Sequence, residues 1–191
     1  MALQKTVDKW KMKKWFQVYA PKAFNDAMIG EMPANEDVAA MDRNITVSLD
    51  SLTKNPQHAN TNVVLRVADV SGTTAKTRFV RMELIYSYIR SIVRRYKSVS
   101  SAVIPVTTKD GTPIVVKIIA ITGARANHSK LVGIRKEMSD LIKAFASDND
   151  LDTLIAAVVE GKLQALLNSK LRHISQLSRV EIKKLEVATA G

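Results

Sequence analysis

Residues 84–121, LIYSYIRSIVRRYKSVSSAVIPVTTKDGTPIVVKIIAI, decide the fold of this chain. From residue 84 to residue 93, apolar side chains recur at i, i+1, i+4, i+5, i+8 and i+9, a spacing that predicts an amphipathic helix. Two apolar runs follow, at 99–108 and 114–121, with Lys109-Asp110-Gly111-Thr112 between them. Asp-Gly supplies the positive φ of a tight turn, so these runs predict a β-hairpin whose apolar face covers the helix.

The same helix carries a run of cations. Arg90, Arg94 and Lys97 recur at i, i+4 and i+7, so we expect them to share one face, which Arg81 and Arg95 flank. No carboxylate occurs between the start of the helix and the hairpin turn. A segment that buries one face and exposes positive groups on another favours a polyanionic partner.

The composition fits a globular, basic protein. The chain has 191 residues, of which 46% are hydrophobic, enough for one domain with a substantial core. Lysine and arginine number 29 against 18 acidic residues, a formal net charge of +11. Such an excess favours nucleic acid first and an acidic membrane surface second. The alternative is a basic protein without a polyanionic partner, and the clustering of the charge argues against it.

Several kinds of site find no support. Because the chain has no cysteine, it has no disulfide framework and no thiolate metal site. His58, His128 and His173 are too far apart for metal-ligand spacing, and we expect them at surface or capping positions. No apolar run approaches the roughly 20 residues of a membrane span, and no signal peptide is visible, so we expect a cytoplasmic protein.

The catalytic motifs are incomplete. Residues 148–152, DNDLD, imitate the start of a calcium loop, but Thr153 stands in place of the required Gly and Val159 in place of the required Glu. An acidic helix cap explains this run better. Gly161-Lys162 lacks the rest of a phosphate-binding loop, and no serine has the Gly-x-Ser-x-Gly setting of a hydrolase nucleophile. We therefore expect neither an enzyme nor a cofactor.

The first twenty residues are basic and aromatic. We interpret them as an extended arm followed by a first strand, in which Phe16 and Val18 alternate as a buried face. The lysines of the arm can neutralise phosphates, and Trp10 can stack on a base. The alternative is an exposed arm whose Trp15 and Phe16 only anchor it in the core.

The remaining pattern predicts an α+β fold, a small β-barrel-like core of antiparallel strands with flanking amphipathic helices and an extended basic N-terminal arm. Besides the hairpin, the expected strands are 28–34, 43–52, 63–67, 73–80 and 180–187, the last with a bulge at Lys183-Lys184. Besides the basic helix, the expected helices are 131–145, capped by Asn127 or Ser129, and 151–171, broken at Gly161. Within one structural domain we expect an arm and first strand (1–20), a β-rich core with the basic helix (21–126), a helical segment (127–174) and a terminal strand and tail (175–191).

A set of short blocks resembles one known family. The blocks include Lys9–Trp15 (KWKMKKW), Ala20-Pro21-Lys22, Val47-Ser48-Leu49, Tyr88-Ile89-Arg90-Ser91, Thr107–Gly111 (TTKDG), Ile134-Arg135-Lys136, Gly161-Lys162-Leu163 and Arg179–Lys184 (RVEIKK). In this order, over nearly the whole chain, they resemble the archaeal and eukaryotic small-subunit ribosomal protein family S-one-e, also called S-three-A-e. The short length is similar to that of the archaeal branch. One departure is Asp42-Arg43, where the family has Gly-Arg.

The resemblance implies a structural, rRNA-binding protein on the platform of the small ribosomal subunit, near the 3′ end of its rRNA and the mRNA exit. It implies a barrel-like core, no catalytic cofactor and a ribosomal location in the cytoplasm. The expected partners are small-subunit rRNA, neighbouring ribosomal proteins of the platform and mRNA near the exit site, with no membrane among them.

The charge pattern and the resemblance select the residues that we predict to bind RNA. They are Lys9, Trp10, Lys11, Lys13, Lys14, Arg78, Arg81, Tyr88, Arg90, Arg94, Arg95, Lys109, Arg125, Arg135 and Lys136. Trp10 and Tyr88 are the stacking candidates, and the others are candidates for phosphate contact. Three alternatives remain: a protein-docking module built on the apolar helices 151–171, an RNA-binding regulator of translation on the same particle, and a metal-dependent enzyme acting on nucleic acid.

Overall fold

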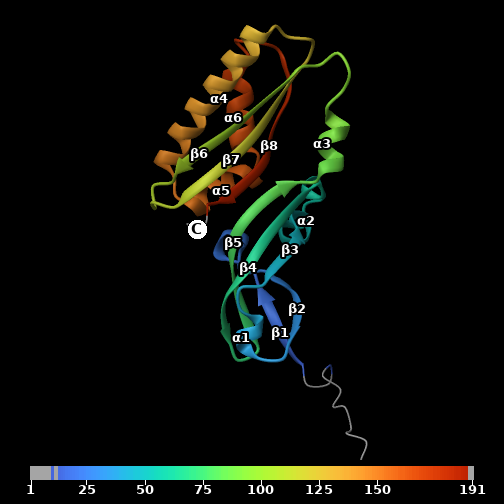
Figure 1. Cartoon of the computed structure of the whole chain (residues 1–191), viewed down its shortest axis with the longest axis vertical. Helices are drawn as coiled ribbons and strands as arrows, with labels where there is room; N and C mark the ends of the chain where they lie inside the picture. The colour runs from blue at the N-terminus through green and yellow to red at the C-terminus, as the bar shows by residue number, and fades with distance from the viewer. Residues whose placement is uncertain (1–9, 11–12, 189–191) are drawn as a thin grey trace, which may run out of the picture.

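The computed structural model describes Trp10 and residues 13–188, an elongated α+β molecule (Figure 1). Its strands are β1 (Lys14–Tyr19), β2 (Met28–Ala34), β3 (Asn44–Ser48), β4 (Thr61–Ser71), β5 (Thr74–Leu84), β6 (Val99–Thr107), β7 (Pro113–Thr122) and β8 (Leu177–Val187). Its helices are α1 (Asp37–Ala40), α2 (Leu49–Thr53), α3 (Tyr86–Ile92), α4 (His128–Asp148), α5 (Leu151–Val159) and α6 (Lys162–Leu171), with the 3-10 turns η1 (Lys22–Phe24) and η2 (Pro56–His58).

One sheet joins all the strands in the order β2-β1-β5-β8-β7-β6, and β3 extends it from β4, which pairs with β5. All pairings are antiparallel except that of β1 with β5. The sheet does not close, so the predicted α+β class is confirmed and the barrel is not. In the described part of the chain, β5 and β8 pair only through Arg81–Glu83 and Lys184–Glu186. Because this seam is short, the two halves diverge and the outer strands β2 and β6 do not meet (Figure 1).

The predicted hairpin is present as β6 and β7. Gly111 has a φ of 75°, and its N–H donates to the Thr108 carbonyl at 2.9 Å, which closes the turn. The neighbouring Asp110 has a second function, because its Oδ2 accepts the N–H of Leu151 at 3.0 Å. The turn therefore caps the N-terminus of α5 and ties the hairpin to the helices.

The main core lies between the sheet and the helices α4, α5 and α6, which cover one face of β6, β7 and β8 (Figure 1). The apolar stripe of α4 is fully buried at Ile134, Met138 and Ile142, as its helical spacing predicts. Gly161 has a φ of 75° and separates α5 from α6, which confirms the predicted break. In the described part of the chain, no helix is long and apolar enough to cross a membrane.

The predicted bulge in the terminal strand is confirmed. In the pairing with β7, Lys184 lies opposite Lys117 and Ile182 lies opposite Ile118, so Lys183 is the extra residue. The extra residue reverses the alternation, so that Leu185 returns to the core face that Ile182 also occupies. A bulge is therefore what keeps both apolar side chains buried.

A smaller core lies in the other half of the sheet. Phe16 and Val18 are buried there against Met32 and Val67, which confirms the first strand, whereas Trp15 is 54% exposed. The predicted strand 43–52 is wrong at its end. It stops at Ser48 because the next residues form α2, whose first side chain, Leu49, belongs to the main core.

The predicted basic helix is shorter than the apolar pattern indicated. Leu84 is the last residue of β5, and Val93 is already extended, with φ −80° and ψ 110°. The prediction that Arg90, Arg94 and Lys97 share one helix face is therefore wrong, because only Arg90 lies in α3. Leu84, just before α3, completes a strand. A pattern that records only whether each residue is apolar or polar cannot distinguish the end of a strand from the first turn of a helix.

The predicted cover of the helix by the hairpin is confirmed. Ile89 of α3 packs against Ile119 and Ile121 of β7, on the opposite face of the sheet from the main core. Strand β7 is therefore buried on both faces, which explains its nearly continuous apolar sequence.

Candidate nucleic-acid interface

Three loops of the chain meet at one end of the sheet. Lys97 Nζ donates to Ser178 Oγ at 3.0 Å, and the N–H of Ala126 donates to Ser98 Oγ at 3.1 Å. The N–H of Gly123 donates to the Gln176 carbonyl at 2.9 Å. These bonds hold together the segment after α3, the β7–α4 connection and the α6–β8 connection, which Figure 1 shows at the same end of the molecule.

The three loops carry cations and no carboxylate. Acidic residues are absent from 84–109, from 122–136 and from 172–180. We call this surface the cationic end, and its members are Arg90, Arg94, Arg95, Lys97, Arg125, Lys130 and Arg179. Uncompensated positive charge gathered from separate segments produces a strong local positive potential.

Three arginines of the cationic end make no polar contact with the described part of the protein. Arg94, Arg95 and Arg125 are exposed, and none of them has a hydrogen bond or ion pair within the described residues. The loop contacts instead anchor neighbouring residues, Lys97, Ser98 and Ala126, so the guanidinium groups are presented without a competing protein acceptor. A guanidinium in this state can bind a phosphate in a bidentate manner.

Two aromatic side chains stand among these cations. Tyr96 is 86% exposed and has a φ of 63°, a left-handed backbone conformation that is costly for tyrosine. Tyr86 is 62% exposed, and the guanidinium of Arg90 lies 4.8 Å from its ring centroid. Our sequence prediction omitted both, although Tyr96 stands directly between Arg95 and Lys97, a pattern that could have identified it.

Tyr88, a predicted stacking residue, is engaged with the protein. Its hydroxyl accepts a hydrogen bond from Arg179 Nη1 at 2.8 Å and donates to Glu181 Oε1 at 3.3 Å. Burial raises the pKa of Tyr88, and the nearby Glu181 carboxylate raises it further. Burial likewise raises the pKa of Glu181, against the hydrogen bond from Tyr88 and the charge of Arg179. Tyr88 therefore positions Arg179 at the border of the cationic end.

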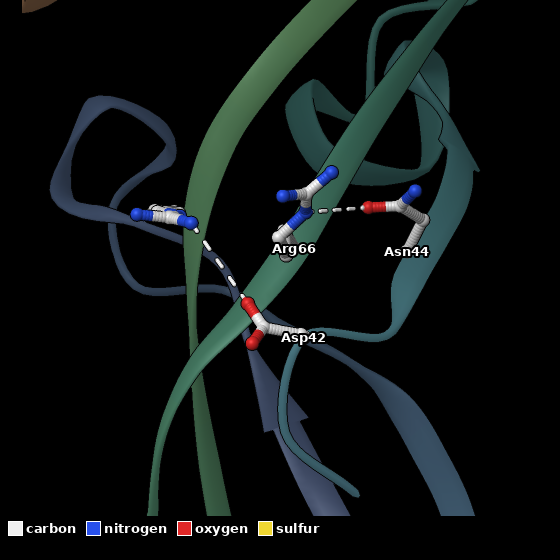
Figure 2. Close-up of polar contacts among 4 residues, drawn as sticks. Asp42, Asn44 and Arg66 are labelled. Atoms are coloured by element: carbon white, nitrogen blue, oxygen red, sulfur yellow. Dashed lines mark hydrogen bonds and ion pairs between the residues drawn. The ribbon is translucent and has the colours of Figure 1, made fainter. Parts of the chain in front are cut away.

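Two other predicted residues, Arg78 and Arg81, lie on β5, away from the cationic end. We call the half of the sheet that contains the smaller core, β1 to β4 with the part of β5 that pairs with them, the far half. Arg78 is 3.9 Å from Asp42 Oδ1, and Arg66 Nε donates to Asn44 Oδ1 at 3.0 Å (Figure 2). Arg81 is half-buried, with its Nε 3.6 Å from Glu83 Oε2. Arg66 and Arg78 thus have an acceptor within the protein, and Arg81, at the seam with β8, has a carboxylate nearby.

The remaining predicted residues are dispersed. Arg135 Nε donates to the Ser101 carbonyl at 3.1 Å on the edge strand β6, and Lys136 is exposed next to it on α4. Lys109 is exposed in the hairpin turn.

At the start of the described chain, Lys13 Nζ lies 3.8 Å from the Trp10 ring centroid, and Lys14 is exposed in β1. Lys9, Lys11 and most of the predicted arm lie outside the described residues. The structure thus brings Arg90, Arg94, Arg95 and Arg125 together and leaves the other predicted residues elsewhere.

The described residues contain no group of three or more histidine, aspartate or glutamate side chains that could hold a metal ion. The acidic run at 148–152 instead lies where α4 ends and α5 begins.

A model of the Ribosomal S3Ae family matches residues 2–191. The chain belongs to this family. Small ribosomal subunit protein eS1 of Sulfolobus acidocaldarius is 38% identical over 184 residues, 96% of this chain and 93% of the relative. The protein of the same name from Natronomonas pharaonis is 37% identical over 182 residues, 95% of this chain and 88% of the relative. That of Methanococcus vannielii is 35% identical over 184 residues, 96% and 84% of the two chains.

Membership in the Ribosomal S3Ae family confirms the resemblance seen in the sequence, including its archaeal character. It makes this chain a structural ribosomal protein and not an enzyme.

Proposed function

We propose that this member of the Ribosomal S3Ae family binds small-subunit rRNA through its cationic end, on the platform near the 3′ end of the rRNA and the mRNA exit. The observation that carries the proposal is the meeting of three carboxylate-free loops, in which exposed Arg94, Arg95 and Arg125 have no hydrogen bond or ion pair with the described residues. Such a surface gives affinity for a phosphate backbone without requiring a particular sequence.

The spatial arrangement favours folded RNA over a flat anionic surface. The cations come from the segment after α3, from the β7–α4 connection and from β8, so they can contact phosphates of more than one RNA strand. Exposed Tyr96 and Tyr86 lie among them, and aromatic rings stack on unpaired bases of RNA loops. Phosphate contacts then position the protein, and stacking selects the unpaired regions.

The other predicted residues form secondary contacts in this proposal. Arg135 and Lys136 on α4 extend the cationic end along the helix, and Lys109 reaches RNA from the hairpin turn. Trp10, with the lysines around it, binds a separate rRNA segment beside the far half of the sheet. Contact with mRNA at the exit site belongs to the same proposal.

The structure favours this function over protein docking through helices 151–171. Leu154, Leu163, Leu167 and Leu171 are all buried in the main core, so their apolar faces are already covered. Leu166 is 38% exposed and is too small a patch for an interface. Neighbouring ribosomal proteins therefore contact other surfaces of the chain.

Crosslinking in intact small subunits tests the proposal. A photoreactive residue is introduced in place of Tyr96 and, as a matched control, in place of exposed Val38 on α1. We expect the position 96 probe to crosslink rRNA near the 3′ end and the position 38 probe to give no such product. Crosslinks from position 96 that map to another part of the subunit would contradict the platform location, and their absence would contradict the interface.

A further inference from the structure

A cavity of about 300 Å³ lies behind α3, at the seam between the two halves of the sheet. Its size is at the lower limit of ligand sites, which suits a single small group (~300–1,000 Å³). The residues that line it come from five parts of the chain, and they include Leu49, Thr61, Met82, Tyr88, Gln164 and Glu181. The cavity is therefore adjacent to the cationic end through Tyr88 and its partner Arg179.

Two residues of the cavity wall, Gln164 and Glu181, carry hydrogen-bond acceptors that the protein does not use. The Nε2 of Gln164 donates to the Val158 carbonyl at 3.0 Å, which fixes the orientation of the amide. Its Oε1 is buried and has no donor within the described residues. Within the described residues, Glu181 accepts one hydrogen bond, from Tyr88, so its carboxylate keeps further lone pairs. A buried acceptor without a donor is costly, which points to a ligand that brings N–H groups.

We propose that this cavity takes an unstacked guanine base of the RNA that binds at the cationic end. The proposal rests on the proposed function, because the cations hold the phosphates that flank the base. The Watson–Crick edge of guanine presents N1–H and N2–H side by side, and a carboxylate accepts both. Glu181 provides that carboxylate, and Gln164 Oε1 accepts the remaining amino proton.

The distribution of charge supports a base over two other occupants. Glu160 and Glu181 both line the cavity, and although Glu160 forms an ion pair with Lys162, Glu181 would repel a phosphate inside it. Arg179 and the rest of the cationic end lie outside, so an incoming lysine or arginine of a neighbouring protein would be repelled as well. Acceptors inside and cations outside match a nucleotide, whose base carries donors and whose backbone carries negative charge.

Short RNAs test the inference on the full chain. The probes are the pentanucleotides UUGUU, UUAUU and UUIUU, where inosine lacks the exocyclic amino group of guanine. We expect UUGUU to bind about tenfold more tightly than UUAUU, with UUIUU between them. Glu181→Gln, which can still accept the Tyr88 hydroxyl, should remove this preference by weakening UUGUU relative to UUAUU, because only the guanine edge needs the carboxylate. Glu186→Gln on the same strand, outside the cavity, is the matched control and should keep the preference.

The outcomes separate this inference from the proposed function. Equal affinity of the natural chain for UUGUU and UUAUU would overturn the inference, as would a preference that survives in both Glu181→Gln and Gln164→Leu. The variant R90A/R94A/R95A should lower the affinity for all three RNAs by the same factor. If the affinities do not change in this variant, the proposed function is contradicted instead. Competition by excess N-acetylarginine amide, but not by guanosine monophosphate, would assign the cavity to a protein side chain and overturn the inference.

Discussion

Arginines serve opposite purposes in the two halves of this molecule. In the far half of the sheet, Arg43 Nη1 donates to the Pro33 carbonyl at 3.0 Å, and Arg66 and Arg78 contact Asn44 and Asp42 (Figure 2). At the cationic end, the exposed arginines have no such acceptor within the described residues, apart from Arg179 with Tyr88.

The difference shows that the number of positive charges does not identify an interface. Arg66 and Arg78 lie directly opposite one another on β4 and β5, an unfavourable pair that Asn44 and Asp42 partly relieve. The carboxylate and amide there stabilise the fold and leave less charge for a partner. At the cationic end the compensating anion is missing, and RNA supplies it in our proposal.

The largest expected effect follows from removing charge at the cationic end. In R90A/R94A/R95A, the dissociation constant for small-subunit rRNA should rise on the order of 100-fold at low salt, because up to three phosphate contacts are lost. The slope of log affinity against log salt should fall by roughly 0.7–0.9 for each contact. Filter binding over a salt series measures both. An unchanged slope would remove these residues from the interface.

The matched variant in the far half should behave in the opposite way. R43A/R66A/R78A removes the same charge, but it also removes two hydrogen bonds of the sheet. The free energy of unfolding should fall by about 1–3 kcal/mol, and the affinity for rRNA should fall less than about tenfold. Urea unfolding and the same binding series give the two values. A larger binding loss here than in R90A/R94A/R95A would reverse our comparison.

A substitution at Tyr96 should change the stability of the fold and the affinity for rRNA in opposite directions. Tyr96→Gly relieves the left-handed backbone and should raise the free energy of unfolding by up to ~1 kcal/mol. It also removes the exposed ring, so binding to rRNA should weaken by about 1–3 kcal/mol if a base stacks there. Tyr96→Phe is the control and should retain binding. Binding of Tyr96→Gly at full affinity would show that the ring does not stack.

The smallest expected effect concerns Glu181 and pH. Burial raises the pKa of this carboxyl above its ordinary value of 4.5, so the folded state disfavours its charged form. The stability of the natural chain should therefore decrease as the pH rises through the raised pKa. Glu181→Gln should be the more stable form at neutral pH, and its advantage should disappear below pH 4.5, where both states carry the proton. If the two forms differ in their free energy of unfolding by the same amount at every pH, the raised pKa of Glu181 is contradicted.

Local signals in the sequence predicted much of the fold. The turn at Asp110-Gly111, the break at Gly161 and the bulge at Lys183 are confirmed, because each depends on a few neighbouring residues. The barrel was wrong because closure depends on how strands far apart in the chain pair, and alternation does not encode that. Leu84 was assigned to a helix because its apolar side chain fits a strand end equally well.

The sequence predicted several residues of the candidate interface but not how the fold brings them together. Arg90 and Arg94 were identified from a helical spacing that the structure does not contain, with Arg95 at its flank, yet the three lie close together in the chain. Arg179 was missed because it is far away in sequence, and only folding brings its segment to the other loops, through Tyr88 and the bond from Lys97 to Ser178. The cavity at Glu181 could not be predicted, because it forms where distant segments meet.

The position of β8 determines when the molecule can be completed during synthesis. Strand β8, which comes after all the other described strands in the sequence, lies between β5 and β7, so in the described part of the chain no strand pairing joins the early half of the sheet to the late half until β8 is made. The early strands can pair as the chain emerges, since domains begin to fold during translation. The full sheet must wait until β8 has left the exit tunnel, so the seam cavity forms only after that strand has been made.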